Sequence, residues 1–359
     1  MKRIILLLIT FFCTAHIEGQ NDSVNIYTPK ISGLIKTKWE YCLDDNTSRF
    51  DIRSIRLKIG GKLNRFVDYG MQADYSVHGK LSFLDGYVQL KLLDNLTLWA
   101  GQFIVRFSEN YVISQYQNIF ANRSFVAKFV NPDARDIGMQ LDYKIKNTPL
   151  TAHIGVYNGA GINNPQWQDS PFVLSRLVYG TMKGFRAGVK YYGGKTVADK
   201  RIANYGVDLR YADDRYNIET EYVVKDSLDT SVYLSAFYLQ GACRFPVDKK
   251  IARYLTPVLR SDAMGYDFFD KGFAVNRLTL GLNVGLDVDY MDAELRFNYE
   301  YFAKKNEPAM AGFSFCIKPF GIWHDERVQS RRQILRRQNC RRQEDCQLRR
   351  RFTLCRRQI

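Results

Sequence analysis

The sequence contains few of the residues that catalytic and metal sites need. Its four histidines, His16, His78, His153 and His324, are far apart, and no His/Cys spacing suits zinc. Neither a Gly-x-Ser-x-Gly elbow nor a phosphate-binding P-loop occurs. The Gly-rich stretches GVYNGAG and YYGGK lie at the ends of expected strands, where glycine marks turns. The sequence therefore predicts no catalytic residues, no metal site and no cofactor.

Cysteines and long apolar runs are also scarce. The 7 cysteines among 359 residues form no disulfide framework, and we expect isolated thiols. After residue 20, no segment approaches the ~20 consecutive apolar residues of a transmembrane helix. A charged start, the apolar stretch 4–12 and a polar stretch that follows it are typical of a secretory signal peptide, here assigned to residues 1–20. An exported chain of this kind is either soluble outside the inner membrane or an outer-membrane β-barrel.

The sequence has instead a repeated alternation of apolar and polar residues. In MDAELRFNYEY, residues 291–301, the apolar and aromatic side chains take one parity and the ionic side chains take the other. A period of two is that of a β-strand with one apolar and one ionic face. The pattern recurs in SIRLKIG, DIGMQLDYKI, FRAGVKY, ANYGVDLRY and RYNIETEYV. We expect a last strand at 311–320 to be poor, because Pro319 interrupts it and a closed barrel has no edge to accommodate proline.

Alternation alone does not separate a membrane barrel from a soluble two-sheet sandwich. Three observations favour the barrel. The strands run to about ten residues, their apolar faces end in Tyr or Phe, and charges of both signs stand in mid-strand. Short and long connections also roughly alternate. We therefore predict an all-β fold, a transmembrane antiparallel β-barrel of about 16 strands over residues 21–320, with the apolar faces toward lipid.

One connection is far longer than the others. Residues 104–133 separate the fifth expected strand from the sixth, and a loop of about 30 residues is unusual in a compact fold. Aromatic residues able to pack against a wall are interspersed with basic ones along it. Such a segment suits a loop that folds into the barrel and narrows it, and an ordinary extracellular loop is the alternative.

Four stretches, taken together and in order, resemble the phosphate-selective porin O and P family. They are GKLNRFVDYGMQADYS (61–76), FLDGYVQLKLLDNLTLWAGQF (83–103), NIFANRSF (118–125) and RDIGMQLDY (135–143). The resemblance spans roughly residues 30 to 305. It implies a sixteen-stranded barrel of the Gram-negative outer membrane that forms homotrimers, whose third loop follows Gly-Gln-Phe and folds inward. It also implies passage of phosphate or pyrophosphate along basic side chains, although Ile104-Val105-Arg106 stands where members often have proline.

Charge at the narrowest point decides which ions a pore prefers, because low-dielectric walls focus the field there. Acids and bases of lumen parity are equally numerous, so the average charge of the lumen sets no preference. We predict that anions meet basic side chains of the long loop and of the facing wall, acting as point charges or guanidinium forks. These residues are Arg106, Arg123, Lys128 and Arg135 on the loop, with Arg56 and Lys58 on the wall.

The sequence thus predicts an outer-membrane porin for passive diffusion of small anionic solutes such as phosphate, without enzymatic activity. Its expected partners are outer-membrane lipid, small anions and copies of itself. The alternative, from another class, is an occluded outer-membrane barrel that acts as a surface binding or structural protein.

The C-terminal part departs from the barrel pattern. Of the net charge of +15, residues 325–359 supply +8, from twelve arginines and four acids without a lysine. Arg-Arg-Gln recurs at 331, 336, 341 and 356, a five-residue register that fits neither strand nor helix. We expect residues 321–359 to be a disordered or frame-shifted tail, with a contact to anionic lipid or lipopolysaccharide as the alternative. Nucleic acid is not an expected partner, because the chain is exported.

Overall fold

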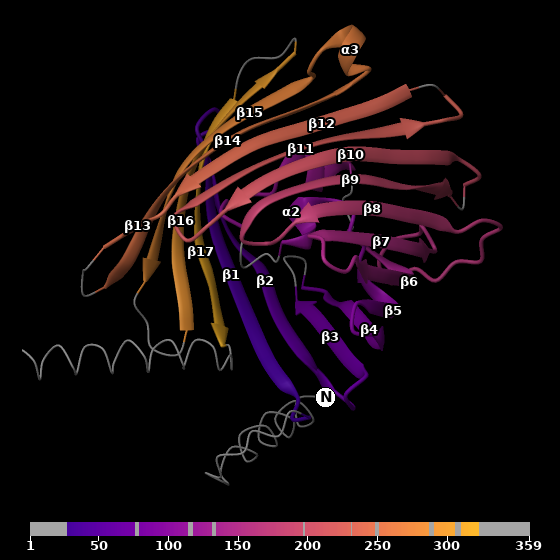
Figure 1. The fold of residues 1–359 in the computed structure, drawn as a ribbon. Coiled ribbons are helices and arrows are strands. Elements are labelled where there is room, and N and C mark those ends of the chain that lie inside the picture. Colours follow the sequence, from indigo (N-terminus) through magenta and orange to yellow (C-terminus); the bar gives the residue numbers. More distant parts are fainter. Residues whose placement is uncertain are drawn as a thin grey trace, which may run out of the picture.

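The computed structural model describes residues 27–75, 79–113, 118–130, 134–196, 198–230, 232–247, 251–286, 291–305 and 310–322. The expected signal peptide and the Arg-rich tail from residue 323 onward lie outside these described residues. Within them, antiparallel strands form one continuous 17-stranded sheet (Figure 1).

The strands pair in chain order, and the longest connection is the one after β5. The strands are β1 (Lys30–Cys42), β2 (Thr47–Lys62), β3 (Val67–Tyr75), β4 (Leu81–Leu93), β5 (Leu96–Ile104), β6 (Arg135–Lys144), β7 (Leu150–Tyr157), β8 (Phe172–Gly180), β9 (Gly184–Lys195), β10 (Arg201–Ala212), β11 (Tyr216–Ser227), β12 (Val232–Cys243), β13 (Phe245–Pro246), β14 (Ala252–Tyr266), β15 (Val275–Leu286), β16 (Met291–Lys304) and β17 (Met310–Ile322). The helical pieces are α2 (Glu109–Val112), a π-helical turn η1 (Val126–Val130) and α3 (Phe268–Lys271). No helix of the described chain is long and apolar enough to cross a membrane.

The sheet closes on itself because its first and last strands pair. β1 pairs with β17 from Thr37–Ile317 to Cys42–Gly312, and with β2 on its other side. β13 has only 2 residues and pairs with β14, so the wall consists of sixteen longer strands. The predicted antiparallel barrel of about 16 strands is confirmed, and six residue pairs between β1 and β17 close it.

The closing strand tolerates its proline because the wall is irregular there. The register of β16 against β17 shifts between the pairs Asp292–Gly321 and Glu294–Lys318, which places Pro319 in a bulge. On the other side, pairing with β1 ends at Ile317. The missing N–H of Pro319 therefore interrupts no ladder, and β17 continues to Ile322, although its pairing with β1 stops before the proline.

The two faces of the strands have the predicted characters. On β16, Phe297 and Tyr301 are 46% and 42% exposed, whereas Glu294 and Arg296 are 4% and 1% exposed. Ala293, which shares the parity of Phe297, is an exception at 4%. Apolar side chains thus face outward along most of the wall, and charged side chains face the interior, as a barrel in lipid requires.

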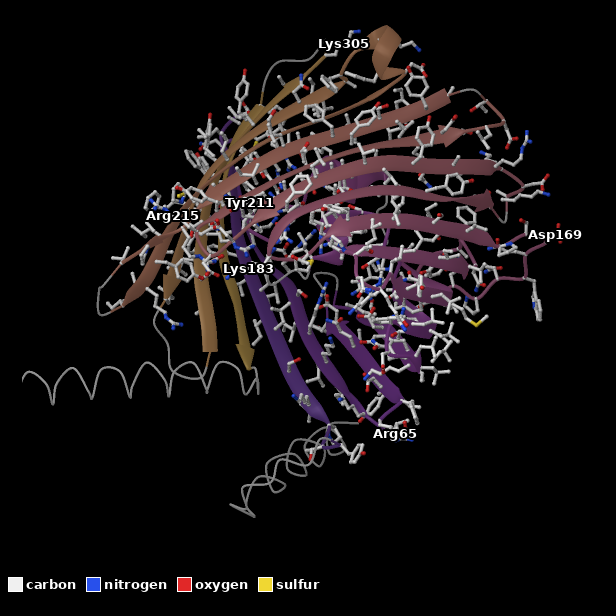
Figure 2. The ribbon with its side chains drawn as sticks, viewed as in Figure 1. Arg65, Asp169, Lys183, Tyr211, Arg215 and Lys305 are labelled. Carbon is white, nitrogen blue, oxygen red and sulfur yellow. The ribbon has the colours of Figure 1, made fainter. Side chains whose placement is uncertain are left out.

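The ends of the barrel differ in their connections. Lys183 and Arg215 lie on the short turns after β8 and β10, at one end of the strands (Figure 2). Asp169 lies at the opposite end, in the longer connection between β7 and β8 (Figure 2). Short turns at one end and longer loops at the other are the arrangement expected of an outer-membrane barrel.

The outward face of β10 provides a test of the barrel in lipid. Val207, in the middle of this strand, is 49% exposed, and Tyr211 near its end is 41% exposed. Arginine is costly at the midplane of a bilayer and cheap at its interface. We expect Val207→Arg to lower the free energy of unfolding in lipid vesicles by about 2–4 kcal/mol, and Tyr211→Arg by roughly 0–1 kcal/mol. Equal losses in denaturant titrations of the two variants would contradict the placement of this face in lipid.

Candidate channel lining and constriction

Near the end of β5, before the long connection, stands a glycine that no other residue can replace without strain. Gly101 has a φ of +123°, a conformation that L side chains rarely adopt. A Cβ at this position would also overlap the carbonyl oxygen of Gly86 and lie 2.9 Å from the Cα of Tyr87. This close approach of β5 to β4 explains the first residue of Gly-Gln-Phe.

The glutamine of the same motif joins three segments of the chain. The side-chain amide of Gln102 donates to the carbonyls of Phe83 (3.1 Å) and Leu84 (2.9 Å), where β4 bulges against β3. Its Oε1 accepts the backbone N–H of Asn163 (2.7 Å), in the connection between β7 and β8. Gln102 thus satisfies carbonyls that a bulge leaves without ladder partners and holds a neighbouring loop against the wall.

The first anchor of the long connection is a buried charge cluster around α2. Glu109 is 0% exposed and accepts from Nη2 of Arg176 on β8 and from Nη1 of Arg186 on β9, both at 2.6 Å. In Figure 1, α2 lies behind these two strands. A carboxylate without water needs such partners, because an unpaired buried charge is strongly unfavourable.

The same cluster extends along the wall to β11. Nζ of Lys190 donates to Asp208 (2.9 Å) and to Glu221 (2.6 Å). Glu221 in turn accepts from the hydroxyl of Ser108 (3.1 Å) and from the backbone N–H of Glu109 (3.2 Å). The start of α2 is therefore fixed to strands β8–β11 through both its side chains and its backbone.

The second anchor consists of five consecutive backbone carbonyls, residues 119–123, each held by a different side chain of the wall. The donors belong to β15, β16, β1, β14 and β15: Asn283 to Ile119 (2.7 Å), Arg296 to Phe120 (2.9 Å), Lys36 to Ala121 (2.9 Å), Arg260 to Asn122 (3.0 Å) and Arg277 to Arg123 (2.7 Å). This segment has no regular secondary structure, so side chains must replace the ladder partners of its backbone. The connection is thus held by two separate parts of the barrel wall.

Two cavities lie against the connection and share part of their lining, and the region between them is called the junction here. The large cavity, about 770 Å³, extends to the ends of β1 and β2 and to the start of β17. The small cavity, about 320 Å³, is bounded by β1–β5. Both are lined by Arg56, Tyr111, Arg123 and Arg135. These four residues therefore surround the junction of the two cavities.

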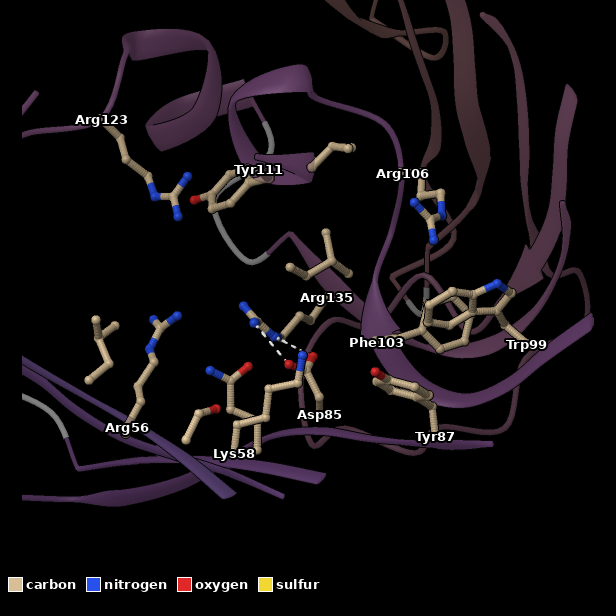
Figure 3. A pocket seen from close by; sticks show the side chains of 16 residues that line it. Arg56, Lys58, Asp85, Tyr87, Trp99, Phe103, Arg106, Tyr111, Arg123 and Arg135 are labelled. Atoms are coloured by element: carbon tan, nitrogen blue, oxygen red, sulfur yellow. Dashed lines mark hydrogen bonds and ion pairs between the residues drawn. The ribbon is translucent and has the colours of Figure 1, made fainter. Parts of the chain in front are cut away.

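The structure brings the six residues predicted from the sequence to these cavities. Three line the junction (Arg56, Arg123, Arg135), two line only the small cavity (Lys58, Arg106) and one lines only the large cavity (Lys128). In Figure 3, Arg56 and Arg123 lie on opposite sides of an open space. The sequence could indicate each residue's face of the wall, and the fold brings all six to one or the other of these two cavities.

The walls of both cavities are predominantly basic. Nine basic residues line the large cavity against two acids, Glu40 and Glu300, and five line the small cavity against Asp85 alone. Asp85 accepts from Nε (2.8 Å) and Nη2 (3.2 Å) of Arg135, so its charge is compensated. Many other acids of the lumen, such as Asp208 and those around α2, form the ion pairs of the first anchor instead and do not line these cavities. A lumen of balanced composition thus contains a basic passage.

Lys58 and Arg123 are the cations of this passage that no described carboxylate neutralises. Lys58 is exposed to the cavity and makes no ion pair within the described chain. Arg123 donates to the carbonyl of Asn110 (2.6 Å), and its guanidinium lies 4.1 Å from the ring centroid of Tyr111. Burial lowers the pKa of Arg123 to about 10, which leaves it charged at neutral pH.

The other predicted residues are partly compensated. Arg56 pairs with Asp74 (2.8 Å), and Arg106 lies 3.4 Å from Asp142 while its guanidinium stacks over Trp99 at 4.8 Å. Such pairs weaken a cation's pull on a solute without removing it, because both guanidinium groups still line the small cavity.

Several basic residues of the large cavity were missed by the sequence analysis. Lys36 and Lys38 on β1 and Arg277 on β15 line it, as does Arg53. The alternation that predicts them is present in KISGLIKTKWEYC, residues 30–42, where Lys36 and Lys38 take the opposite parity to Ile35 and Trp39. Reading the parity of every strand, including the first, would have found them.

The described residues contain no group of His, Cys, Asp or Glu able to hold a metal ion. His153 instead pairs with Asp142 at 2.6 Å. Cys42 and Cys243 are free thiols, as the cysteine spacing predicted.

The buried anchor should stabilise the barrel far more than an exposed ion pair does. Replacing Glu109 by Gln leaves Arg186 without its carboxylate partner and Arg176 with Asp208 alone, and we expect a loss of about 3–5 kcal/mol in the free energy of unfolding. The matched control is Asp214→Asn, which breaks an exposed pair with Lys183 and should change little. Denaturant titration in vesicles measures both, and similar effects of the two substitutions would refute the anchoring role of Glu109.

Comparison with known proteins finds one matching family model and a set of solved outer-membrane barrels. Residues 39–170 match the family model described as phosphate-selective porin O and P. No curated protein matches the chain in sequence.

Among solved structures, OprB of Pseudomonas putida aligns with a TM-score of 0.59 at 11% identity, covering 82% of this chain and 94% of that one. The anion-selective porin from Comamonas acidovorans aligns at 0.57 and 10% identity, covering 82% and 99%. The trimer form of OmpT from Vibrio cholerae aligns at 0.56 and 12% identity, covering 81% and 99%. The resemblance to the phosphate-selective porin O and P family is therefore confirmed over residues 39–170, and the barrel has the fold of outer-membrane porins, which are channels.

Proposed function

We propose that this channel lets small anions, phosphate among them, diffuse passively through the two joined cavities. The observation that carries the proposal is the junction, where Arg56, Arg123 and Arg135 line both cavities. Low-dielectric walls focus the field of these charges, so the junction favours anions over cations. The description of the matched family as phosphate-selective and of one structural neighbour as anion-selective supports the same assignment.

The connection between β5 and β6 is the element that would narrow the lumen. It supplies Tyr111 and Arg123 to the junction, and its two anchors hold it against β8–β11 and against β14–β16 with β1. A constriction discriminates between solutes only if it keeps its shape, and the anchors provide that rigidity.

A solute would meet basic side chains one after another along this route. Arg53 and Lys38 line the large cavity, the arginines of the junction follow, and Lys58 and Arg106 line the small cavity. Guanidinium forks match the oxygens of a phosphate, and ammonium groups act as point charges. Several weak sites in series allow both entry and exit, which a single tight site would prevent.

We also propose a homotrimer embedded in outer-membrane lipid. Support comes from the neighbour described as a trimer and from the large apolar side chains exposed along the outer wall. Native mass spectrometry of the detergent-extracted protein distinguishes this assembly from a monomer.

Two further proposals concern the ends of the chain. We propose that residues 1–20 are removed on export, which N-terminal sequencing of the mature protein tests. Residues 321 and 322 of the expected tail 321–359 end β17. We propose that the remaining Arg-rich segment, 323–359, is not part of the barrel, and resequencing the gene end tests the frame change inferred from its composition.

Arg123 provides the sharpest test of anion preference, because it faces the junction without a carboxylate partner. We expect Arg123→Gln to reduce the chloride-to-potassium permeability ratio about twofold to fivefold, as loss of one charge near the path predicts. The matched control is Arg215→Gln on the turn after β10, which lines neither cavity and should leave the ratio unchanged.

Reversal potentials in a KCl gradient across planar bilayers measure this ratio. A cation-selective wild-type channel would refute the proposal. Folded protein that produces no conducting steps would favour the occluded surface barrel instead.

A further inference from the structure

The small cavity has two unlike walls. On one side, the rings of Tyr87, Trp99 and Phe103 form a continuous platform, with centroids 4.9 Å apart for the first pair and 5.5 Å for the second. On the other side lie Arg56 and Lys58 (Figure 3). Basic side chains attract an anion without aromatic rings beside them. The presence of three rings on the opposite wall therefore suggests a second kind of contact with the solute.

The rings of this platform are tilted to one another, by 44° for Tyr87 and Trp99 and by 45° for Trp99 and Phe103, and the wall packs closely against Tyr87. Tyr87 lies against β3 over Gly70, where an added Cβ would come within 2.5 Å of the ring. The glycine thus permits a close approach that any side chain would block. Tyr87 and Trp99 are only half-buried, and both line the cavity. Their rings can therefore meet a solute while their other sides rest on the barrel.

The charges around the platform favour an anionic group beside it. Arg106 lies over the Trp99 ring at 4.8 Å and lines the same cavity. Asp85 is the one acid among the lining residues, and it already accepts hydrogen bonds from Nε and Nη2 of Arg135. A negative group can therefore sit near Lys58 and Arg56 without facing a free carboxylate.

Inorganic phosphate gains little from aromatic rings, because every one of its oxygens seeks a hydrogen bond or a cation. A solute with a planar apolar body uses both walls, since its ring stacks on the platform while its acidic group meets the basic side. We propose that the small cavity is a transit site for organic anions that carry an aromatic ring, such as aromatic phosphates and carboxylates. This inference rests on the proposed function, because only an anion-conducting barrel would admit such solutes.

Open-channel block in planar bilayers tests the site with two monoesters of matched charge. Phenyl phosphate and methyl phosphate are added separately, and the concentration that halves the chloride current is measured for each. Because aromatic contacts add modestly to binding, we expect phenyl phosphate to act at about a threefold to tenfold lower concentration.

The platform variants show whether the rings cause this difference. Trp99→Ala should bring the two concentrations together, and Tyr87→Leu does the same by a milder change if the first variant fails to form channels. The matched control is Tyr254→Ala, which removes a ring that lines a separate cavity near the turns after β8 and β10. It should retain the wild-type ratio.

The outcomes separate this inference from the function it rests on. Equal block by the two esters in the wild type, with chloride preference intact, overturns the aromatic site and leaves the anion porin standing. A ratio that persists in the platform variants also overturns it. Cation selectivity in the KCl gradient overturns the anion porin itself.

Discussion

An irregular backbone inside a closed barrel must satisfy its polar groups with side chains, because every strand already uses its own hydrogen bonds for the wall. Residues 119–123 meet this requirement with five donors from four strands. That requirement gives the arginines of the lumen two different roles. Arg260 and Arg296 hold the connection, whereas Arg56 and Arg123 face the junction of the cavities. In the proposed anion channel, selectivity would depend on which guanidinium groups the backbone leaves available.

The need for charge compensation likewise divides the acids of the lumen into two groups. Buried carboxylates require cationic or hydrogen-bonding partners, and Glu109, Asp208 and Glu221 find theirs on the β8–β11 wall. Around the junction, the acids that remain are paired with arginines or lysines of the same cavities. A lumen with similar numbers of acids and bases thus becomes uneven in space. The anchored side is neutral and well packed, and the opposite side is basic and open.

The sequence carried most of the fold and part of the site. Strict alternation showed the strands, their faces and the position of the long connection, because lipid and water impose opposite characters on neighbouring residues. It also placed Arg56 and Lys58 on the lumen wall. It could not show that Pro319 lies in a bulge, since register is a property of paired strands. Nor could it separate Arg296, which holds a carbonyl, from Arg123, since both appear in sequence as basic residues of the interior.

The position of Arg123 shows how closely anchor and constriction are linked. Its carbonyl is held by Arg277 at 2.7 Å, and its guanidinium donates to the carbonyl of Asn110, one residue after Glu109. The first contact belongs to the anchor on β14–β16, and the second reaches the anchor on β8–β11. The charge at the junction is therefore placed by both walls at once. A change in either wall would move this cation relative to Arg56, so the residues proposed to select solutes and the residues that hold the connection form one mechanical unit.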